Sequence, residues 1–557
     1  MKRFSALFLT ILTSVATIMT GCEKEIDTPQ KKQPASFLNL IQAYEDGRIF
    51  SSAELAATGC VITFQDGFDI KIPKSEMEIY DHRNSQPPVI KTNGGWWSVG
   101  TKVLAVKVDT SLPDRECFPV YVYFDKFTLY MHLSNGRKLK FPSALLLEQE
   151  KLEEEIRKKQ NIPVVRITTD GGAGIYDKKN YVKGSISISD PENMYSDVTT
   201  FTGRMGIRGR GNSTWSFPKK PWKVKLDEKA SLLGMPADKE WALLANYADR
   251  TLVRNIVAMK LSEICGFSWT PRMRSVEVYL NDEYQGVYTL CEHKKVSSDR
   301  VNIDLVGESD NDGEAVTGGY YFEIEQQQDE TTVWMTGMGV PMMFSDPEVP
   351  TDAQLSYAKK YFEDFEASLH SKDLADPAKG YAAYIDVPSF IDYYIVQELT
   401  KNIDGNLRKS SFITKERGRK LEMYHLWDFD LTLGNCGYFD WSVGNGPENF
   451  WIKDFTPGSW KGENWFNLMM EDPAFVDQLQ KRWNQLKPEF DKIPEFIDEQ
   501  VFSLAKAQER NFRKWSILES VDWVYFPSLG SYEKEVAYLK EFYTDRLAWL
   551  DRELNKL

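Results

Sequence analysis

Short segments in which apolar and polar residues alternate fill positions 38–144 and predict a β-rich domain. The clearest pair, 60–64 and 68–73, is joined by Asp66-Gly67, a dipeptide typical of tight hairpin turns. Ser134-Asn135-Gly136 predicts a second hairpin turn further along the chain. Several short strands joined by such turns are typical of a small β-sandwich, which we expect for this region.

The pattern changes after residue 160, where strands mix with longer helical segments and predict an α+β domain over 161–557. Between the two domains, 145–160 is rich in Glu and Lys with few apolar positions, which predicts a solvent-exposed linker helix. Further on, apolar residues at helical spacing follow Asp249, a good N-cap, and stop at Gly266. Other helices are predicted over 355–370, 388–401 and 533–556, and strands over 274–280, 284–290 and 318–325.

The strand predicted over 222–227 has two distinct faces. Lys223 and Lys225 share one face, and three apolar residues share the other. A strand lysine that faces a cleft can hold nucleotide phosphates, as it does in protein kinases. The alternative is an ordinary solvent-exposed strand face, and this pattern by itself favours the alternative.

Positions 203–214 form a Gly- and Arg-rich segment that includes Asn212 and Ser213. Its glycines allow the backbone to approach a ligand closely, while backbone N–H groups and the guanidinium groups of Arg208 and Arg210 suit phosphate. The alternative is an Arg-rich structural turn, because the segment matches neither of the common phosphate-loop patterns.

Two aspartates, Asp404 and Asp428, flank a predicted hairpin whose strands cover 411–414 and 421–426. Because a hairpin returns the chain to its starting point, we expect the two side chains to lie close together. Protein kinases pair a catalytic-loop Asp with a metal-binding Asp in this way. The alternative is ordinary turn chemistry, since Asp is common in loops.

Composition limits the classes of function. A chain of 557 residues is expected to form two or three domains. It has 82 acidic and 68 basic residues and a net charge of −14, which disfavours a nucleic-acid partner. Aromatic residues make up 13% of the chain, which argues against disorder and suits surfaces that bind sugar or protein. The cysteines show no CxxC spacing, which argues against a metal cluster.

Residues 1–22 have the pattern of a bacterial lipoprotein signal peptide. A basic pair precedes the apolar stretch 7–19, which is too short to cross a membrane. Gly21-Cys22 then resembles a lipobox, with Cys22 as the lipidated first residue, although an ordinary secretory signal with an incidental cysteine is the alternative. An acidic run opens the tether 23–37, as in surface-exported lipoproteins of the Bacteroides type. We therefore expect a lipid anchor in the outer membrane and display at the cell surface.

Six motifs within 163–482 occur together and in order, and through them the chain resembles the CotH kinase family, named for a spore coat protein H. The motifs are 208–213, 219–225, 241–249 with 252–255, 286–288 with Glu292, 402–404 and 427–430. The N-terminal β-rich domain lies outside this resemblance.

The resemblance implies an atypical protein-kinase-like fold that moves phosphate from ATP to protein Ser residues with Mg²⁺ or Mn²⁺. Asp404 would orient or deprotonate the acceptor hydroxyl, and Asp428 would hold the metal, with Asp430 and Asn406 as further ligands. Lys223 or Lys225, with Arg208 and Arg210, would hold the phosphates, and Asn212 and Ser213 would also belong to the nucleotide site. Glu292 would lie at this site near the connection between the lobes.

Two features favour an alternative, a surface binding or assembly protein that keeps the fold without catalysis. Kinases carry a metal-binding Asn five residues after the catalytic Asp, and here that position is Lys409. ATP is also scarce outside the inner membrane. Such a protein would bind a protein or a glycan through aromatic residues expected at the surface, namely Trp96-Trp97, Asp440-Trp441, Phe450-Trp451, Trp460 and Trp465. A glycan hydrolase with paired carboxylates is a weaker alternative, because the Asp pair has a kinase-like context.

The lipid anchor is directly testable. We expect Cys22→Ala to move the protein out of the membrane fraction, because the thiol that carries the lipid is removed. The measurement is partition between membrane and soluble fractions. Unchanged membrane partition of Cys22→Ala would show that Cys22 is not the anchor.

Overall fold

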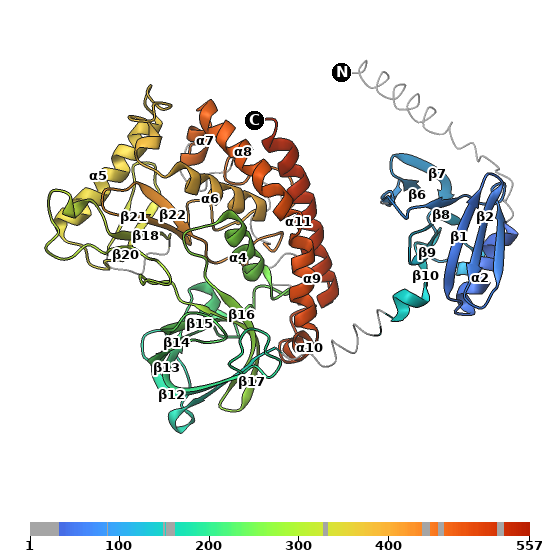
Figure 1. Ribbon diagram of the computed structural model, residues 1–557, viewed down its shortest axis with the longest axis horizontal. Helices are drawn as coiled ribbons and strands as arrows, with labels where there is room; N and C mark the ends of the chain where they lie inside the picture. Colours follow the sequence, from blue (N-terminus) through green and yellow to red (C-terminus); the bar gives the residue numbers. More distant parts are fainter. Residues whose placement is uncertain are drawn as a thin grey trace, which may run out of the picture. The chain divides into compact units, whose positions relative to one another are not determined.

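The structure is a computed structural model that describes residues 33–85, 87–148, 151, 162–326, 332–436, 446–454, 462–520 and 528–557. Its contacts divide the chain into two compact units, 1–156 and 157–557, and each unit is described by itself (Figure 1). The predicted signal peptide with Cys22, most of the tether and most of the linker helix lie outside the described residues. Within the described ranges, no helix has both the length and the apolar character needed to cross a bilayer.

The first unit is sheet-rich, as predicted. It also contains a helix that the alternating pattern did not predict, α2 (Ala35–Glu45), which begins after Pro34 and buries Phe37, Leu40 and Ile41 in the core shared with the strands. The strands form three small sheets: β1 (Phe50–Ala56) with β2 (Gly59–Phe64) and β3 (Asp69–Pro73); β4 (Ile79–Asp81) with β8 (Pro119–Phe124), β9 (Thr128–Leu133) and β10 (Lys138–Pro142); and β5 (Ile90–Asn93) with β6 (Trp96–Val99) and β7 (Lys102–Lys107). The first two sheets contribute to the core.

Both predicted hairpins of this unit are confirmed. β2 pairs antiparallel with β3 across Asp66-Gly67, and β9 pairs antiparallel with β10 across 134–136. Cys60, Ile62 and Phe64 alternate into the core on β2, as the sequence pattern predicts for a strand with one buried face.

The second unit begins with a closed barrel of seven strands. Around the barrel the order is β11 (Val164–Thr169), β12 (Val182–Ser189), β13 (Thr200–Gly209), β14 (Trp222–Ala230), β15 (Asp238–Leu244), β17 (Glu283–Glu292) and β16 (Met273–Leu280). Neighbouring strands are antiparallel except β11 and β16, which are parallel and close the barrel. The strands predicted over 274–280 and 284–290 are β16 and β17, which pair antiparallel across Asn281-Asp282.

The remaining chain forms a five-stranded antiparallel sheet and helices. The sheet order is β19 (Val333–Met335), β20 (Pro341–Asp346), β18 (Tyr320–Ile324), β21 (Ser411–Lys415) and β22 (Leu421–His425). The helices are α4 (Arg254–Cys265), α5 (Asp352–Leu369), α6 (Val387–Thr400), α7 (Trp465–Met469), α8 (Pro473–Phe490), α9 (Ile493–Ser503), α10 (Ala505–Lys514) and α11 (Tyr532–Leu554). The α+β class is therefore confirmed for this unit, as are the helices predicted over 355–370, 388–401 and 533–556.

One large apolar core joins the sheet to the helices, and α6 is almost entirely buried within it. In Figure 1 the barrel strands lie at one end of the unit and α6, α8 and α11 lie at the other. The C-terminal α10 returns to the barrel, where Asn511 accepts a hydrogen bond from the Val287 N–H of β17 (3.0 Å).

The helix predicted to start at Asp249 begins at Arg254 instead. Leu252 adopts a positive φ of 65°, which breaks the helical backbone just before α4. The Asp249 carboxylate still accepts the Arg254 N–H (2.8 Å), so it stabilises the first turn from a position five residues before the helix begins. The predicted end at Gly266 is confirmed, since Gly266 adopts the left-handed conformation with φ 74°.

The prediction that these aromatic residues lie at the surface is wrong for three of them. Phe450, Trp451 and Trp465 are buried in the large core, because they pack between helices that the sequence pattern did not place next to them. The partners 440–441 and Trp460 lie outside the described residues. In the first unit Trp96 is exposed, while Trp97 is half-buried and donates from Nε1 to the Ser134 carbonyl (2.9 Å).

Candidate active site

A polar pocket in the second unit collects charged side chains from segments far apart in the sequence. Its acidic lining residues are Glu323, Glu325, Asp404, Asp428 and Asp430, and its basic lining residues are Arg210, Lys219, Lys294 and Lys409. Both signs of charge in one pocket suit a ligand that carries phosphate together with a metal ion.

The two aspartates that flank the predicted hairpin meet in this pocket. Asp404 lies in the loop after α6, and Asp428 lies three residues after β22. β21 and β22 pair antiparallel, so the chain returns to its starting point as the sequence predicted. Both carboxylates line the pocket, and the charge of Asp404 is close enough to act on Asp428.

Asp428 has a strained backbone. Its φ of 67° lies in the left-handed region, which costs a non-glycine residue about 1–3 kcal/mol and is most frequent at functional sites. Contacts on both sides hold this conformation. The Phe429 N–H donates to Oδ1 of Asn255 (2.8 Å), and the Ser410 hydroxyl donates to Oδ2 of Asp428 (3.4 Å). These contacts therefore fix where the Asp428 carboxylate points.

Burial and neighbouring charges alter the pKa values of Asp428 and Asp430. Burial raises the pKa of Asp428, and the charge of Asp404 raises it further, while Arg210 and Lys409 oppose the rise. Burial also raises the pKa of Asp430 well above its usual range, and the charges of Asp428 and Asp404 add to this. Carboxylates that share a pocket repel one another when ionised, and a bound cation would relieve that repulsion.

The donor set fits a divalent cation that arrives with phosphate. Mg²⁺ in proteins is commonly held by one or two carboxylates together with phosphate oxygens and water. Asp428 and Asp430 supply two carboxylates. Over the described part of the chain, no group of three or more His, Cys, Asp or Glu is arranged to hold a metal by itself. Substrate phosphate would have to complete the coordination.

The loop that carries Asp404 is tightly held. The Asp404 carboxylate accepts a hydrogen bond from Nη2 of Arg408 (2.7 Å), and its backbone carbonyl accepts the Lys409 N–H (3.1 Å). A Cβ on Gly405 would lie 2.0 Å from Oε1 of Gln397, so this position has no space for a larger residue. Tyr393 of α6 donates to the Gly405 carbonyl (2.5 Å). The loop therefore has one fixed course from α6 to β21.

The Gly-rich segment also lines the pocket. β13 ends at Gly209, and the residues after it, 210–214, line the pocket. Gly211 has a φ of 85°, and a Cβ there would lie 2.1 Å from the Thr214 hydroxyl oxygen, so both conformation and space require glycine. Arg210 is half-buried, desolvation lowers the pKa of its guanidinium, and the guanidinium lies 5.6 Å from the ring centroid of Trp427.

Residues 207–550 match the family model described as CotH kinase protein, and this span covers more than half of the chain. The chain belongs to the CotH kinase protein family. In a comparison with curated proteins, no sequence matches the chain. All the lining residues of the pocket fall within the matched CotH region.

Three predicted phosphate-binding residues of the CotH region lie outside the pocket. Trp222, Val224 and Leu226 fill the barrel interior, so Lys223 and Lys225 face outward, where both pair with Glu240 (2.7 and 3.7 Å). Arg208 is paired with Lys223 in the strand register, and it donates to the Lys178 carbonyl and lies over the Tyr181 ring (5.1 Å). Arg210, in contrast, lines the pocket, because it lies beyond the end of β13.

Glu292 and Asn406 also lie outside the pocket lining. Glu292 is fully buried at the end of β17 and is held by Arg272 (3.1 Å) and Arg300 (3.9 Å). Asn406 belongs to the loop that carries Asp404. It is fully buried, and its Nδ2 donates to the Trp451 carbonyl (3.4 Å). Asn212 and Ser213, in contrast, line the pocket.

Two pocket lysines were not singled out from the sequence. Lys219 is buried, and burial lowers its pKa well below the usual range; its Nζ donates to Asn511 Oδ1 (2.8 Å) and to the Val287 carbonyl. Lys294 forms an ion pair with Glu323. Lys219 lies in a motif of the family resemblance, but only the fold brings its acceptors, 292 and 68 residues away, to it.

A buried ion pair fixes the loop that carries Asp428 and Asp430. Asp249 and Arg254 are each about 1% exposed and lie 2.6 Å apart. Arg254 also donates from Nε to the Thr432 carbonyl (3.0 Å). Nδ2 of Asn435 donates to the carbonyls of Ala248 (2.6 Å) and of Asp430 (2.7 Å). The turn before α4 therefore holds the acidic loop in place.

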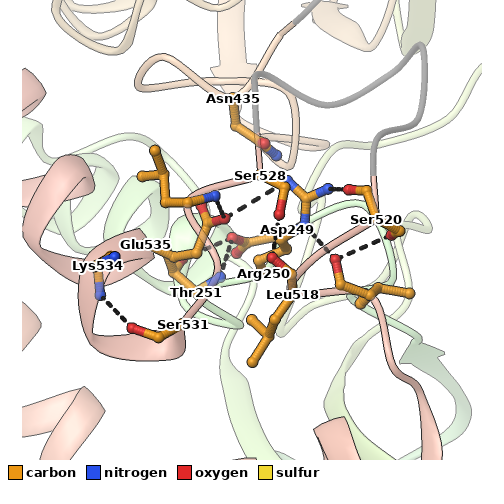
Figure 2. A network of polar contacts seen from close by, with 12 residues as sticks. Asp249, Arg250, Thr251, Asn435, Leu518, Ser520, Ser528, Ser531, Lys534 and Glu535 are labelled. Carbon is orange, nitrogen blue, oxygen red and sulfur yellow. Dashed lines mark hydrogen bonds and ion pairs between the residues drawn. The ribbon is translucent and has the colours of Figure 1, made fainter.

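The same turn is anchored to the C-terminal part of the chain. Figure 2 shows Arg250 between the segment around Ser520 and the start of α11. Its Nη2 donates to the Ser520 carbonyl (2.6 Å), and its Nη1 lies 3.6 Å from Glu535. Residues more than 260 positions away in the sequence thus hold the turn next to the pocket.

We expect Asp249→Ala to destabilise the second unit by about 3–5 kcal/mol, because Arg254 would remain buried without its carboxylate partner. The measurement is urea unfolding followed by tryptophan fluorescence. The control is Asp477→Ala, which removes a solvent-exposed pair with Lys481 (2.7 Å) and should cost about 1 kcal/mol or less. Equal, small effects of the two variants would show that the buried pair does not hold the unit together.

Proposed function

We propose that this protein is an exported lipoprotein whose CotH domain transfers the γ-phosphate of ATP to Ser residues of a protein acceptor. One observation carries the proposal. Three carboxylates from two loops, Asp404, Asp428 and Asp430, line the same pocket as four basic side chains. Phosphoryl transfer depends mainly on positioning and on neutralising charge, and this pocket offers groups for both.

The pocket residues divide into roles. Asp428 and Asp430 would hold a divalent cation, Mg²⁺ or Mn²⁺, which when bound neutralises charge on the phosphates. Arg210 would contact phosphate oxygens from the side of the Gly-rich segment, where Asn212 and Ser213 would add polar contacts.

Asp404 would act on the acceptor. Its carboxylate would accept the hydrogen of the acceptor Ser hydroxyl and align that oxygen with the γ-phosphorus. As the new oxygen–phosphorus bond forms, the bond between the γ-phosphorus and the bridging oxygen of ADP breaks, and the hydroxyl proton passes to Asp404. Arg408, 2.7 Å from Asp404, would keep this carboxylate oriented.

The cellular setting is part of the proposal. Lipidation of Cys22 would attach the protein to the outer membrane, with its acidic tether leading to the cell surface, and the partner would be a protein substrate. ATP would then come from the surroundings, or transfer would occur before export.

A second candidate is a surface protein that binds a protein or glycan on the same fold without catalysis. The observation that favours it is the loop after Asp404, where Lys409 lines the pocket and Asn406 does not. The exposed Trp96 of the first unit is an aromatic surface that a glycan could stack against.

Asp404→Ala and Asp428→Ala should fail differently. Asp404→Ala should spare nucleotide binding and lower phosphate transfer by about 10²-fold or more, because only the acceptor loses its contact. Asp428→Ala should weaken metal-dependent nucleotide binding, because the cation loses a ligand. The measurements are transfer of labelled phosphate from ATP to dephosphorylated casein and calorimetric titration with ATP.

Asp477→Ala, a change of the same type on the exposed face of α8, is the control and should leave both quantities unchanged. If the wild-type protein binds ATP without transferring phosphate to any Ser-containing protein, the binding-protein candidate replaces the kinase.

A further inference from the structure

Position 409 is where the pocket departs from the protein-kinase pattern. In kinases the Asn five residues after the catalytic Asp holds the second of two divalent cations. Here that position, 404 + 5, is occupied by Lys409. A protonated lysine has three donors and no acceptor, so it cannot be a ligand of a cation.

The loop carries Lys409 into the pocket and does not turn it out to solvent. Lys409 lines the pocket together with Asp404 and Asp428, and its positive charge lowers the pKa of Asp428. Its own N–H donates to the Asp404 carbonyl (3.1 Å), which closes the loop from 404 to 409. Leu407 and Ser410 on either side have positive φ values of 49° and 48°, so the loop is bent on both sides of it.

The neighbouring amide does not take over the task of the missing Asn. The Asn406 side chain is fully buried and donates to the Trp451 carbonyl (3.4 Å), and Asn406 is not among the pocket-lining residues. Asn255, which does line the pocket, uses its Oδ1 to accept the Phe429 N–H (2.8 Å). Neither amide oxygen therefore replaces the metal ligand of position 409.

We infer that the Lys409 ammonium takes the place of the second divalent cation, so that the pocket binds ATP with one divalent cation. This inference rests on the proposed function. Asp428 and Asp430 remain as the ligands of the single cation. Lys409 supplies a fixed positive charge beside Asp428 and donates directly to phosphate oxygens. It also repels any cation that approaches its own position, which disfavours a second site there.

Two carboxylates already have basic partners within or beside the pocket. Five carboxylates and four basic groups line it. Glu323 is already paired with Lys294, and Asp404 is already paired with Arg408, so two of the carboxylates have positive partners of their own. Asp428 and Asp430 lie two residues apart in one loop and both line the pocket, and they are the carboxylates that one cation would satisfy.

The test counts Mn²⁺ bound to the full-length protein in detergent with a non-hydrolysable ATP analogue, by electron paramagnetic resonance of free and bound Mn²⁺. We expect one Mn²⁺ per bound nucleotide in the wild type and two in Lys409→Asn, which restores the kinase ligand. Lys409→Arg keeps the positive charge and should stay at one. Lys481→Asn, the same change on an exposed helix, is the control and should also stay at one.

The outcomes separate this inference from the function on which it rests. Two Mn²⁺ per nucleotide in the wild type would overturn the inference and leave the kinase proposal intact. One Mn²⁺ in both the wild type and a folded Lys409→Asn would also overturn it. If Lys409→Asn does not fold, Lys409→Gln gives the same comparison, since its amide oxygen can bind a cation. Absence of nucleotide binding in the wild type would overturn both.

Discussion

The buried ion pair between Asp249 and Arg254 is the interaction on which the pocket depends. Both groups are removed from water, and such a pair is stable only when hydrogen bonds satisfy the remaining donors and acceptors. Here those hydrogen bonds also hold other segments of the chain in place. Asp249 accepts the backbone N–H groups of Thr251 and Arg254, and Arg254 donates to carbonyls in the loop after Asp430. The hydrogen bonds that this buried pair requires therefore also set the position of the loop that carries Asp428 and Asp430.

That geometry is unfavourable in the absence of a ligand. Asp428 has a left-handed backbone, and its carboxylate lines the same pocket as those of Asp404 and Asp430. Strain and like-charge repulsion persist in a folded protein only when the surrounding structure enforces them. The large aromatic core around α6 and the C-terminal segment held by Arg250 provide that support. Repulsion between the carboxylates in the pocket therefore favours the binding of a cation.

The sequence predicted the local elements well where the pattern was periodic. The hairpins across Asp66-Gly67 and between β21 and β22, the end of α4 at Gly266 and the three later helices are as predicted. The convergence of Asp404 and Asp428 could be predicted because a hairpin constrains both of its ends. The N-terminal α2 was missed, because its apolar residues directly precede strands and were taken with them.

What could not be predicted depends on contacts between distant segments. Lys223 and Lys225 alternate correctly on β14, yet the closure of a barrel decides that their face points away from the pocket. Lys219 becomes a pocket residue because α10, almost 300 residues later, supplies Asn511. Phe450 and Trp451 are core residues because Glu398 of α6 accepts the N–H groups of Trp451 and Ile452 and draws that loop inward. None of these relations leaves a periodic signal in the sequence.

The central claim is that the pocket of Asp404, Asp428 and Asp430 binds a nucleotide triphosphate together with a divalent cation. Calorimetric titration of the purified wild-type protein with ATP tests it most directly, with Mg²⁺ or Mn²⁺ present and again after chelation by EDTA. The account predicts saturable binding with either metal and loss of that binding in EDTA. No ATP binding with either metal, or binding that EDTA leaves unchanged, would contradict it.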